Sequence, residues 1–218
     1  AITNIKLGKL NKQIGNGIIE ACDQLINLNL INHFPLSIWQ TGSGTQTNMN
    51  ANEVISNYAI KKLNGKIGSK KPIHPNDHVN LSQSSNDTFP TVMHIACNEL
   101  IKLKLKKSLN NLSIELKNKV KEFKDIIKIG RTHTQDATPI TLGQEFSGYL
   151  EQIKNNQIRI NTSIKELQFL AQGGTAVGTG LNSHKDFDKI FCQNLSKLTK
   201  SLYKPSPNKF ESIATHDT

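Results

Sequence analysis

Two long stretches of the chain repeat apolar residues at helical spacing, and these repeats limit the possible folds more than any other feature. The first repeat has an apolar side chain every three or four residues and comprises Leu105, Leu109, Leu112, Leu116, Val120, Phe123 and Ile127. With the turns before it, this repeat predicts a helix from about Thr88 to Ile127, roughly 55–60 Å long if unbroken. The second repeat follows Pro139 and comprises Leu142, Phe146, Leu150, Ile153, Ile160, Ile164, Leu167 and Ala171. The fold class predicted from these repeats is all-α.

Helices of this length need partners along their whole length. Two of them cannot enclose a core alone, so we expect other subunits or further sequence to complete a bundle. Shorter helices are predicted over about residues 9–27 and 185–200, and no strand signal of any weight is present. We therefore expect a small N-terminal helical domain over residues 1–84 and part of a long-helix bundle over residues 85–218.

Local signals predict where two of the helices begin and end. Asn50 with Glu53 three residues later is a capping-box arrangement, and the helix it opens should stop near Leu63, before Asn-Gly. Thr138 is a suitable N-cap for the second long helix, because Pro139 then occupies the first helical position, where its missing N–H costs nothing.

The net charge of +10, from 27 basic and 17 acidic side chains, raises the possibility of an anionic partner. The basic residues are almost all lysines spread along a helical segment, a pattern typical of a solvated face. Nucleic-acid sites usually interleave arginine and aromatic residues with lysine. We therefore expect no nucleic-acid partner, although a basic helical scaffold without enzymatic activity stays an alternative.

The composition also bears on membrane association and on the cellular compartment. No run of about 18 apolar residues is present, so no membrane-spanning helix and no membrane partner are expected. The three cysteines, Cys22, Cys97 and Cys192, lie far apart and form no C-x-x-C pair. Reduced thiols indicate a cytoplasmic protein, or one of the mitochondrial matrix if the source is eukaryotic.

Two polar clusters precede the long helices. Residues 41–48 place hydroxyl side chains between glycines, which lets the backbone approach a carboxylate or phosphate, although this segment alone favours an ordinary flexible loop. Residues 74–78 hold His74 and His78 at i, i+4 with an acid between them. Because Pro75 disfavours a helix there, we expect a hydrogen-bonding turn and no metal site.

Two further clusters carry groups suited to binding and proton transfer. Residues 83–87 (QSSND) lie directly before a long helix, where they can cap it and where free N–H groups favour an anion. Residues 128–139 contain His133, whose imidazole titrates near neutral pH and can accept a proton. A structural role for this lone histidine stays open on the pattern alone. The glycine-rich stretch 172–180 lacks dinucleotide-binding spacing and indicates close packing.

Taken together, these clusters resemble the class II fumarases of the fumarase/aspartase superfamily. The matching runs occur in family order and are Gly42–Asn50, His74–Asn80, Gln83–Thr91, Gly130–Pro139, Gly143–Phe146, Ala171–Asn182 and Lys209–Glu211. Thr132-His133-Thr134 resembles the fumarase branch most, because aspartases tend to have a glutamine where His133 stands.

The resemblance implies reversible hydration of fumarate to (S)-malate in the citric acid cycle, with no cofactor and no metal. It implies that substrate is bound by Ser43, Gly44, Thr45, Ser84, Ser85, Asn86 and Thr132. It implies a part in proton transfer for His133 and a second anion site formed by His74, Pro75, Asn76 and Asp77. It also implies a homotetramer whose active sites are shared between subunits.

The chain departs from the family pattern in length. Class II fumarases are roughly twice as long, and a later signature that supplies their catalytic serine, a lysine and an asparagine is absent from these 218 residues. We therefore expect an internal fragment that is itself inactive or nearly so. An aspartase-like ammonia-lyase is the alternative within the superfamily. An iron–sulfur fumarase is disfavoured, because three scattered cysteines do not suit a cluster.

Overall fold

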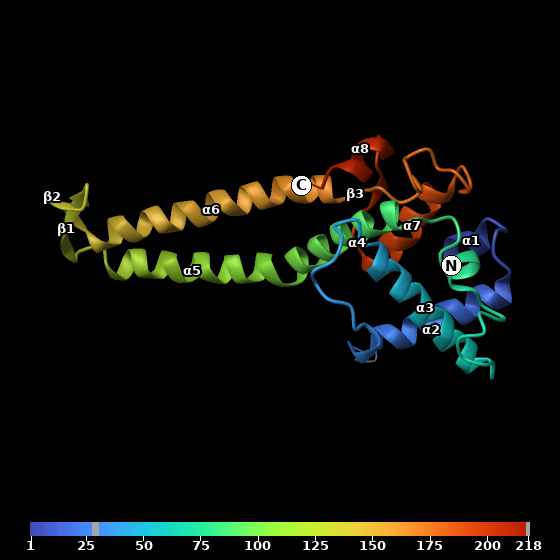
Figure 1. Cartoon of the computed structure of the whole chain (residues 1–218). Helices are drawn as coiled ribbons and strands as arrows, with labels where there is room; N and C mark the ends of the chain where they lie inside the picture. The colour runs from blue at the N-terminus through green and yellow to red at the C-terminus, as the bar shows by residue number, and fades with distance from the viewer. Residues whose placement is uncertain (28–30, 217–218) are drawn as a thin grey trace. The chain divides into compact units, whose positions relative to one another are not determined.

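The computed structural model describes residues 1–27 and 31–216 and is mostly helical (Figure 1). The helical segments are α1 (Ile2–Lys6), α2 (Lys12–Asn27), η1 (Ile31–His33), α3 (Thr45–Lys62), η2 (Pro75–Val79), α4 (Ser85–Leu100), η3 (Ile101–Leu105), α5 (Lys106–Glu122), α6 (Leu142–Leu167), α7 (Phe187–Thr199) and α8 (Lys209–Ala214). The strands are β1 (Ile127–Thr132) with β2 (Gln135–Thr141), antiparallel, and β3 (Phe169–Leu170) with β4 (Lys204–Pro205), parallel. The predicted helical fold class is confirmed, with small sheets added to it.

The chain divides into two compact units. Unit 1 comprises residues 1–95 and 168–218, and unit 2 comprises residues 96–167. These units are defined by contacts within one copy of the chain. The predicted domain division between residues 84 and 85 is not tested by them and stays a prediction. Among the described residues, no helix is long and apolar enough to cross a membrane.

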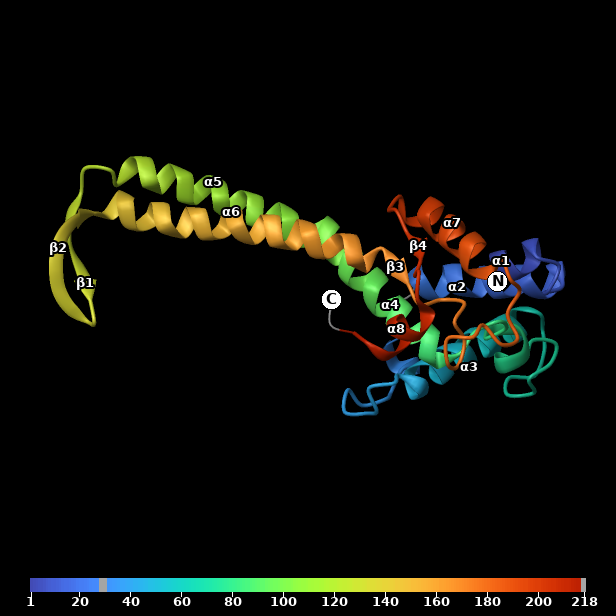
Figure 2. The ribbon, with the colours of Figure 1, turned by 90° about the horizontal axis from the view of Figure 1, so that it is seen from above.

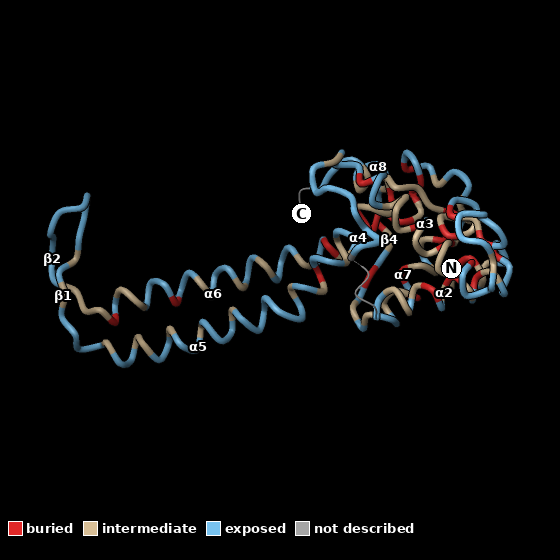
Figure 3. The backbone as a smooth tube through the Cα atoms, turned by 60° about the horizontal axis from the view of Figure 1, so that its bottom comes forward, coloured by how far each residue is buried: buried red, intermediate tan, exposed pale blue. Residues whose placement is uncertain are grey.

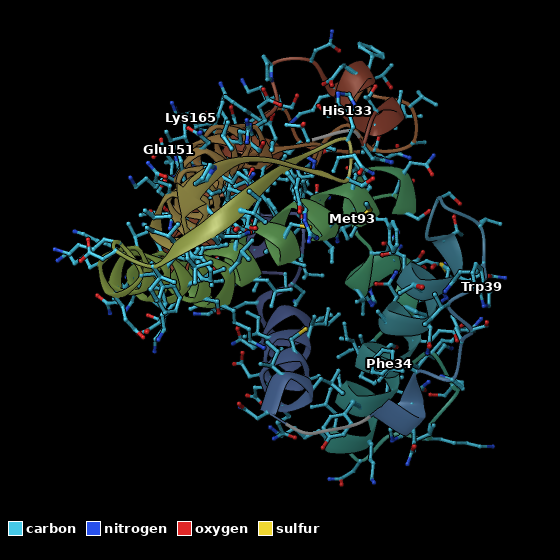
Figure 4. All side chains as sticks on the ribbon, turned by 90° about the vertical axis from the view of Figure 1, so that its left-hand side faces the viewer. Phe34, Trp39, Met93, His133, Glu151 and Lys165 are labelled. Carbon is cyan, nitrogen blue, oxygen red and sulfur yellow. The ribbon has the colours of Figure 1, made fainter. Side chains whose placement is uncertain are left out.

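Unit 1 contains two clusters of buried apolar side chains. The first lies between α2, α3 and the segment around η2, and its buried members are Leu10, Ile18, Ala21, Ala59, Ile60, Ile73 and Val79. The second consists of Leu170, Cys192 and Tyr203. The segment between η1 and α3 contributes no residue to these clusters. Its Trp39 is 92% exposed and lies at the edge of the unit (Figure 4).

Unit 2 is built around two long antiparallel helices, α5 and α6, which lie side by side in Figures 1 and 2. At the hairpin end the ring of Phe146 lies between two others, with its centroid 5.2 Å from that of Phe123 and 5.6 Å from that of Tyr149. Helix α5 has no buried residue, and α6 buries only Gly143, Leu150 and Leu167 (Figure 3). The pair is therefore amphipathic with little core of its own.

Several predicted helix boundaries are confirmed and others are wrong. The helix predicted to stop near Leu63 ends there, with Leu63 as its C-cap, but α3 begins at Thr45 and not after Asn50. Gly44 is the N-cap of α3 and adopts φ +67°, a conformation that favours glycine. The helix predicted from Thr88 to Ile127 is divided into α4, the π-helical turn η3 and α5, and it stops at Glu122.

The predicted loop between the long helices is in fact a β-hairpin. Ile129 pairs with Pro139 and Thr132 with Gln135, so Thr138 and Pro139 lie in β2 and do not start α6. His133 and Thr134 form the two-residue turn, with φ values of +48° and +65°. Such turns usually carry Asn-Gly or Asp-Gly, and that signal is missing here. The alternation of Ile127 and Ile129 with polar neighbours is too short to predict a strand, so the expectation of no strands is wrong here.

Candidate functional site

The start of α4 is fixed by a reciprocal cap. The Ser84 hydroxyl accepts a hydrogen bond from the Asn86 N–H at 3.3 Å, and the Asp87 carboxylate accepts one from the Ser84 N–H at 2.9 Å. This arrangement resembles a capping box with aspartate at its third position. One predicted site residue, Ser84, is thus the cap, which leaves the side chains of Ser85 and Asn86 for other contacts.

Asp87 is fully buried and joins two segments that are far apart in the sequence. Its second carboxylate oxygen accepts hydrogen bonds from the backbone N–H groups of Gly173 and Thr175, each at 2.9 Å, and from the Gln172 side-chain amide at 3.3 Å. Burial raises the pKa of Asp87, and the hydrogen bonds from Ser84, Thr175 and Gly173 oppose that rise. Asp87 therefore holds the glycine-rich segment against the start of α4.

Hydroxyl groups from the first polar cluster meet the start of α4. The Ser43 and Thr41 hydroxyls lie 2.8 Å apart, and the Thr45 hydroxyl lies 3.0 Å from that of Ser85. Gly44 makes this approach possible, because a Cβ at its position would lie 2.1 Å from the ring of Phe89 on α4. The predicted substrate-binding residues Ser43, Gly44 and Thr45 are thus brought together with Ser85.

A cavity of about 400 Å³ opens beside these groups within unit 1. Its lining includes Ser84, Ser85, Thr175, Asn76, Asn80 and Asn48. The Asn80 side-chain oxygen accepts hydrogen bonds from the amides of Asn48 at 3.2 Å and Asn52 at 3.1 Å, which ties α3 to this wall. Hydroxyl and amide groups beside a helix N-terminus suit a carboxylate ligand.

The glycine-rich stretch contributes a cavity residue that the sequence reasoning missed. The Asn86 side-chain amide donates to the Ala176 carbonyl at 2.8 Å, and the neighbouring Thr175 lines the cavity. The close packing predicted for this stretch is confirmed: a Cβ at Gly173 would lie 2.7 Å from Cβ of Asp188 on α7, and one at Gly178 would lie 2.7 Å from the ring of Phe210 on α8. A threonine between glycines was the available signal, but the sequence gives no sign that Asp87 anchors it.

The second predicted anion site is a helical turn capped by a histidine. Nδ1 of His74 accepts hydrogen bonds from the N–H groups of Asn76 and Asp77, each at 3.2 Å, and the His74 N–H donates to Nδ1 of His78 at 2.9 Å. The hydrogen-bonding turn predicted here is confirmed, although Pro75 starts the helical turn η2 and does not prevent it. With Nδ1 as an acceptor, the proton of neutral His74 is on Nε2, which makes Nε2 a donor. No cluster of three or more potential metal-ligating side chains occurs within residues 1–27 and 31–216.

Thr132 and His133 belong to unit 2, so they are not part of the unit 1 cluster. Both are exposed on the β1–β2 hairpin, and the Thr134 hydroxyl donates to the His133 carbonyl at 2.6 Å. Arg131 and Asp136 pair across the hairpin at 3.3 Å. At the base of the same hairpin Lys128 forms an ion pair with Glu145 of α6, which lowers the pKa of that carboxyl. The hairpin therefore presents the imidazole on a defined turn.

The profile of a family described as lyase matches residues 1–218. The chain belongs to this lyase family. It is 58% identical over 217 residues to the class II fumarate hydratase of Caulobacter vibrioides, covering 100% of this chain and 47% of the relative. It is also 58% identical over 217 residues to the mitochondrial fumarate hydratase of Saccharomyces cerevisiae, covering 44% of that protein. The resemblance predicted from the motifs is confirmed, and the chain spans about half the length of these relatives.

Solved structures of this lyase family have the same fold. A class II fumarase from Schistosoma mansoni is 46% identical and superposes with a TM-score of 0.92, covering 99% of this chain and 48% of that one. A fumarate lyase/delta crystallin protein from Brucella melitensis is 37% identical with a TM-score of 0.89, covering 97% of this chain and 46% of that one.

Proposed function

We propose that the protein carrying this chain hydrates fumarate reversibly to (S)-malate. The observation that carries the proposal is the meeting of Ser43, Thr45 and Ser85 hydroxyls beside a polar cavity at the start of α4. Helix N-termini and hydroxyl groups stabilise carboxylates without a metal ion. The 58% identity to fumarate hydratases supports this choice among the reactions of lyases.

The proposed chemistry builds negative charge on a substrate carboxylate. Removing the proton next to that carboxylate of malate yields a dianionic aci-carboxylate. Cleavage of the C–O bond then releases the hydroxyl group, which is protonated to water by a general acid, and gives fumarate. Donors that are already in place stabilise such charge more than mobile water does. We assign this task to Ser43, Gly44, Thr45, Ser84, Ser85, Asn86 and Thr132.

His133 is the proposed proton-transfer residue, and it acts through a water molecule. An imidazole can accept a proton at one ring nitrogen and donate one at the other, which suits a general acid or base. The turn of His74, Pro75, Asn76 and Asp77 is the proposed second anion site, because Nε2 of His74 is a donor there. We further propose a homotetramer with shared active sites, located in the cytoplasm or in the mitochondrial matrix.

The test uses the full-length protein that carries these residues and follows the loss of fumarate absorbance. His133→Asn is expected to lower kcat about 10²- to 10⁴-fold, which is the usual contribution of general acid–base catalysis. His33→Asn, at an exposed histidine outside the proposed site, is the matched control and should leave kcat unchanged. The 218-residue chain alone is expected to be inactive or nearly so, because it lacks the serine that the resemblance implies.

One outcome would contradict the proposed reaction, and another would contradict only the role of His133. A full-length protein that ignores fumarate but releases ammonia from aspartate is an ammonia-lyase. A His133→Asn variant with the activity of the wild type removes the assigned proton-transfer role and leaves the overall reaction standing.

A further inference from the structure

We infer that Thr175 is an additional substrate-binding residue, whose hydroxyl hydrogen-bonds a substrate carboxylate held at the start of α4, directly or through one ordered water. The inference rests on the proposed function and extends its site to the glycine-rich segment. Neither sequence pattern nor the resemblance assigned Thr175 a role.

The first observation is a buried hydroxyl without a partner. Thr175 is 4% exposed, and its Oγ1 is buried with no hydrogen-bond partner in the described part of the chain. Buried polar groups are nearly always hydrogen-bonded, and an unpaired one requires an explanation. A ligand oxygen or an ordered water in an adjoining cavity can provide the missing partner.

The second observation is position. Thr175 lines the same cavity as Ser84 and Ser85, which begin α4. A carboxylate bound at a helix N-terminus has lone pairs left for further donors, and a threonine hydroxyl is such a donor. Thr175 lies on another segment of the cavity lining, and its hydroxyl, which has less than 1 Å² of accessible surface, can bind the same anion from a second side after rotation about χ1.

The third observation is a strained backbone held in place by a buried charge. Thr175 adopts φ +56°, which is unusual for a β-branched residue. Its N–H donates to the Asp87 carboxylate at 2.9 Å, and that carboxylate also receives the Ser84 N–H at 2.9 Å. One side chain thus fixes both the start of α4 and Thr175. Strain maintained in this way is concentrated at functional sites.

The chemistry selects the class of ligand. The cavity wall offers hydroxyl and amide donors, and no lysine or arginine is among its lining residues. We therefore expect the ligand to be a small dicarboxylate. Thr175 and the start of α4 bind the same carboxylate group of this ligand.

The test compares Thr175→Val with Thr91→Val in the full-length protein. Valine preserves the shape of threonine and removes only the hydroxyl. Thr91 is the matched control, since it is 1% exposed, its Oγ1 also has no partner in the described residues, and it does not line the cavity. Neither variant loses a hydrogen bond to the described residues, so the melting temperature of both should equal or exceed that of the wild type.

Thr175→Val is expected to raise the KM for fumarate and the inhibition constant of succinate by roughly 10- to 100-fold, the effect of losing a hydrogen bond to a charged group. Thr175→Ser keeps the hydroxyl and should restore most of the affinity. Thr91→Val should leave both constants unchanged. A purely structural role for Thr175 would change the melting temperature without this separation between valine and serine.

Succinate affinity, measured calorimetrically, keeps the two hypotheses apart. If the wild type hydrates fumarate and Thr175→Val behaves like Thr91→Val, the role of Thr175 is overturned and the proposed function stands. If the wild type binds succinate without hydrating fumarate, the proposed reaction fails, and the affinity of Thr175→Val for succinate still decides the role of Thr175. A wild type that neither hydrates fumarate nor binds succinate overturns both.

Discussion

At the scale of single residues, Asp87 determines the geometry of the cavity wall. Its carboxylate accepts hydrogen bonds from the backbone of Ser84, Gly173 and Thr175. Asp87→Asn replaces one acceptor oxygen with a donor and leaves at least one of these buried N–H groups unpaired. We expect the variant to lose about 2–4 kcal/mol of unfolding free energy, measured by urea denaturation.

Asp186→Asn provides the comparison for Asp87. The Asp186 side chain is partly exposed and lies 3.8 Å from His184, a distance too long for a strong interaction. Its replacement should change stability by less than about 0.5 kcal/mol. Equal stability of the two variants would mean that the buried carboxylate does not hold the glycine-rich segment.

At the scale of secondary-structure elements, α6 starts with a capping box at Thr141, three residues after Thr138, which the sequence predicted as the N-cap. The Thr141 hydroxyl accepts from the Gln144 N–H at 3.1 Å, and the Gln144 side chain accepts from the Thr141 N–H at 2.9 Å. Thr141→Ala should cost about 1 kcal/mol, measured by thermal unfolding followed by circular dichroism. Thr138→Ala, in β2, should cost less than half as much. The reverse order would restore Thr138 as the cap.

The same element explains how far the sequence could predict this fold. Apolar spacing located α5 and α6 correctly, because burial of one face depends only on which positions are apolar. The start of α6 was misplaced because Thr138-Pro139 also fits the pattern of a helix start. Pairing of β2 with β1 overrode that local preference, and the turn of His133 and Thr134 carries no glycine to indicate it. The polar clusters were recognisable as residue types, but only the fold shows that Asp87 connects one of them, residues 83–87, to the glycine-rich stretch 172–180.

At the scale of the whole molecule, unit 2 leaves large apolar side chains uncovered. Leu103 is 66% exposed and Ile158 is 64% exposed, and Leu112 and Ile114 on α5 are also exposed. These side chains are exposed on segments next to or within two helices that bury few residues between them. Exposed apolar surfaces of this kind usually mark contacts with other chains. Completion of the bundle by other subunits stays a prediction of the sequence.

The association that follows from this surface can be measured on the 218-residue chain. We expect the sedimentation coefficient to rise with protein concentration, because copies bury these leucine and isoleucine side chains against one another. Leu112→Lys places a charge at an exposed apolar position of α5 and should shift the chain toward the monomer. Asn111→Lys adds the same charge at the neighbouring exposed polar position and should leave association unchanged. If the wild type is monomeric at every concentration, or if both variants associate equally, the bundle is not completed through Leu112 of α5.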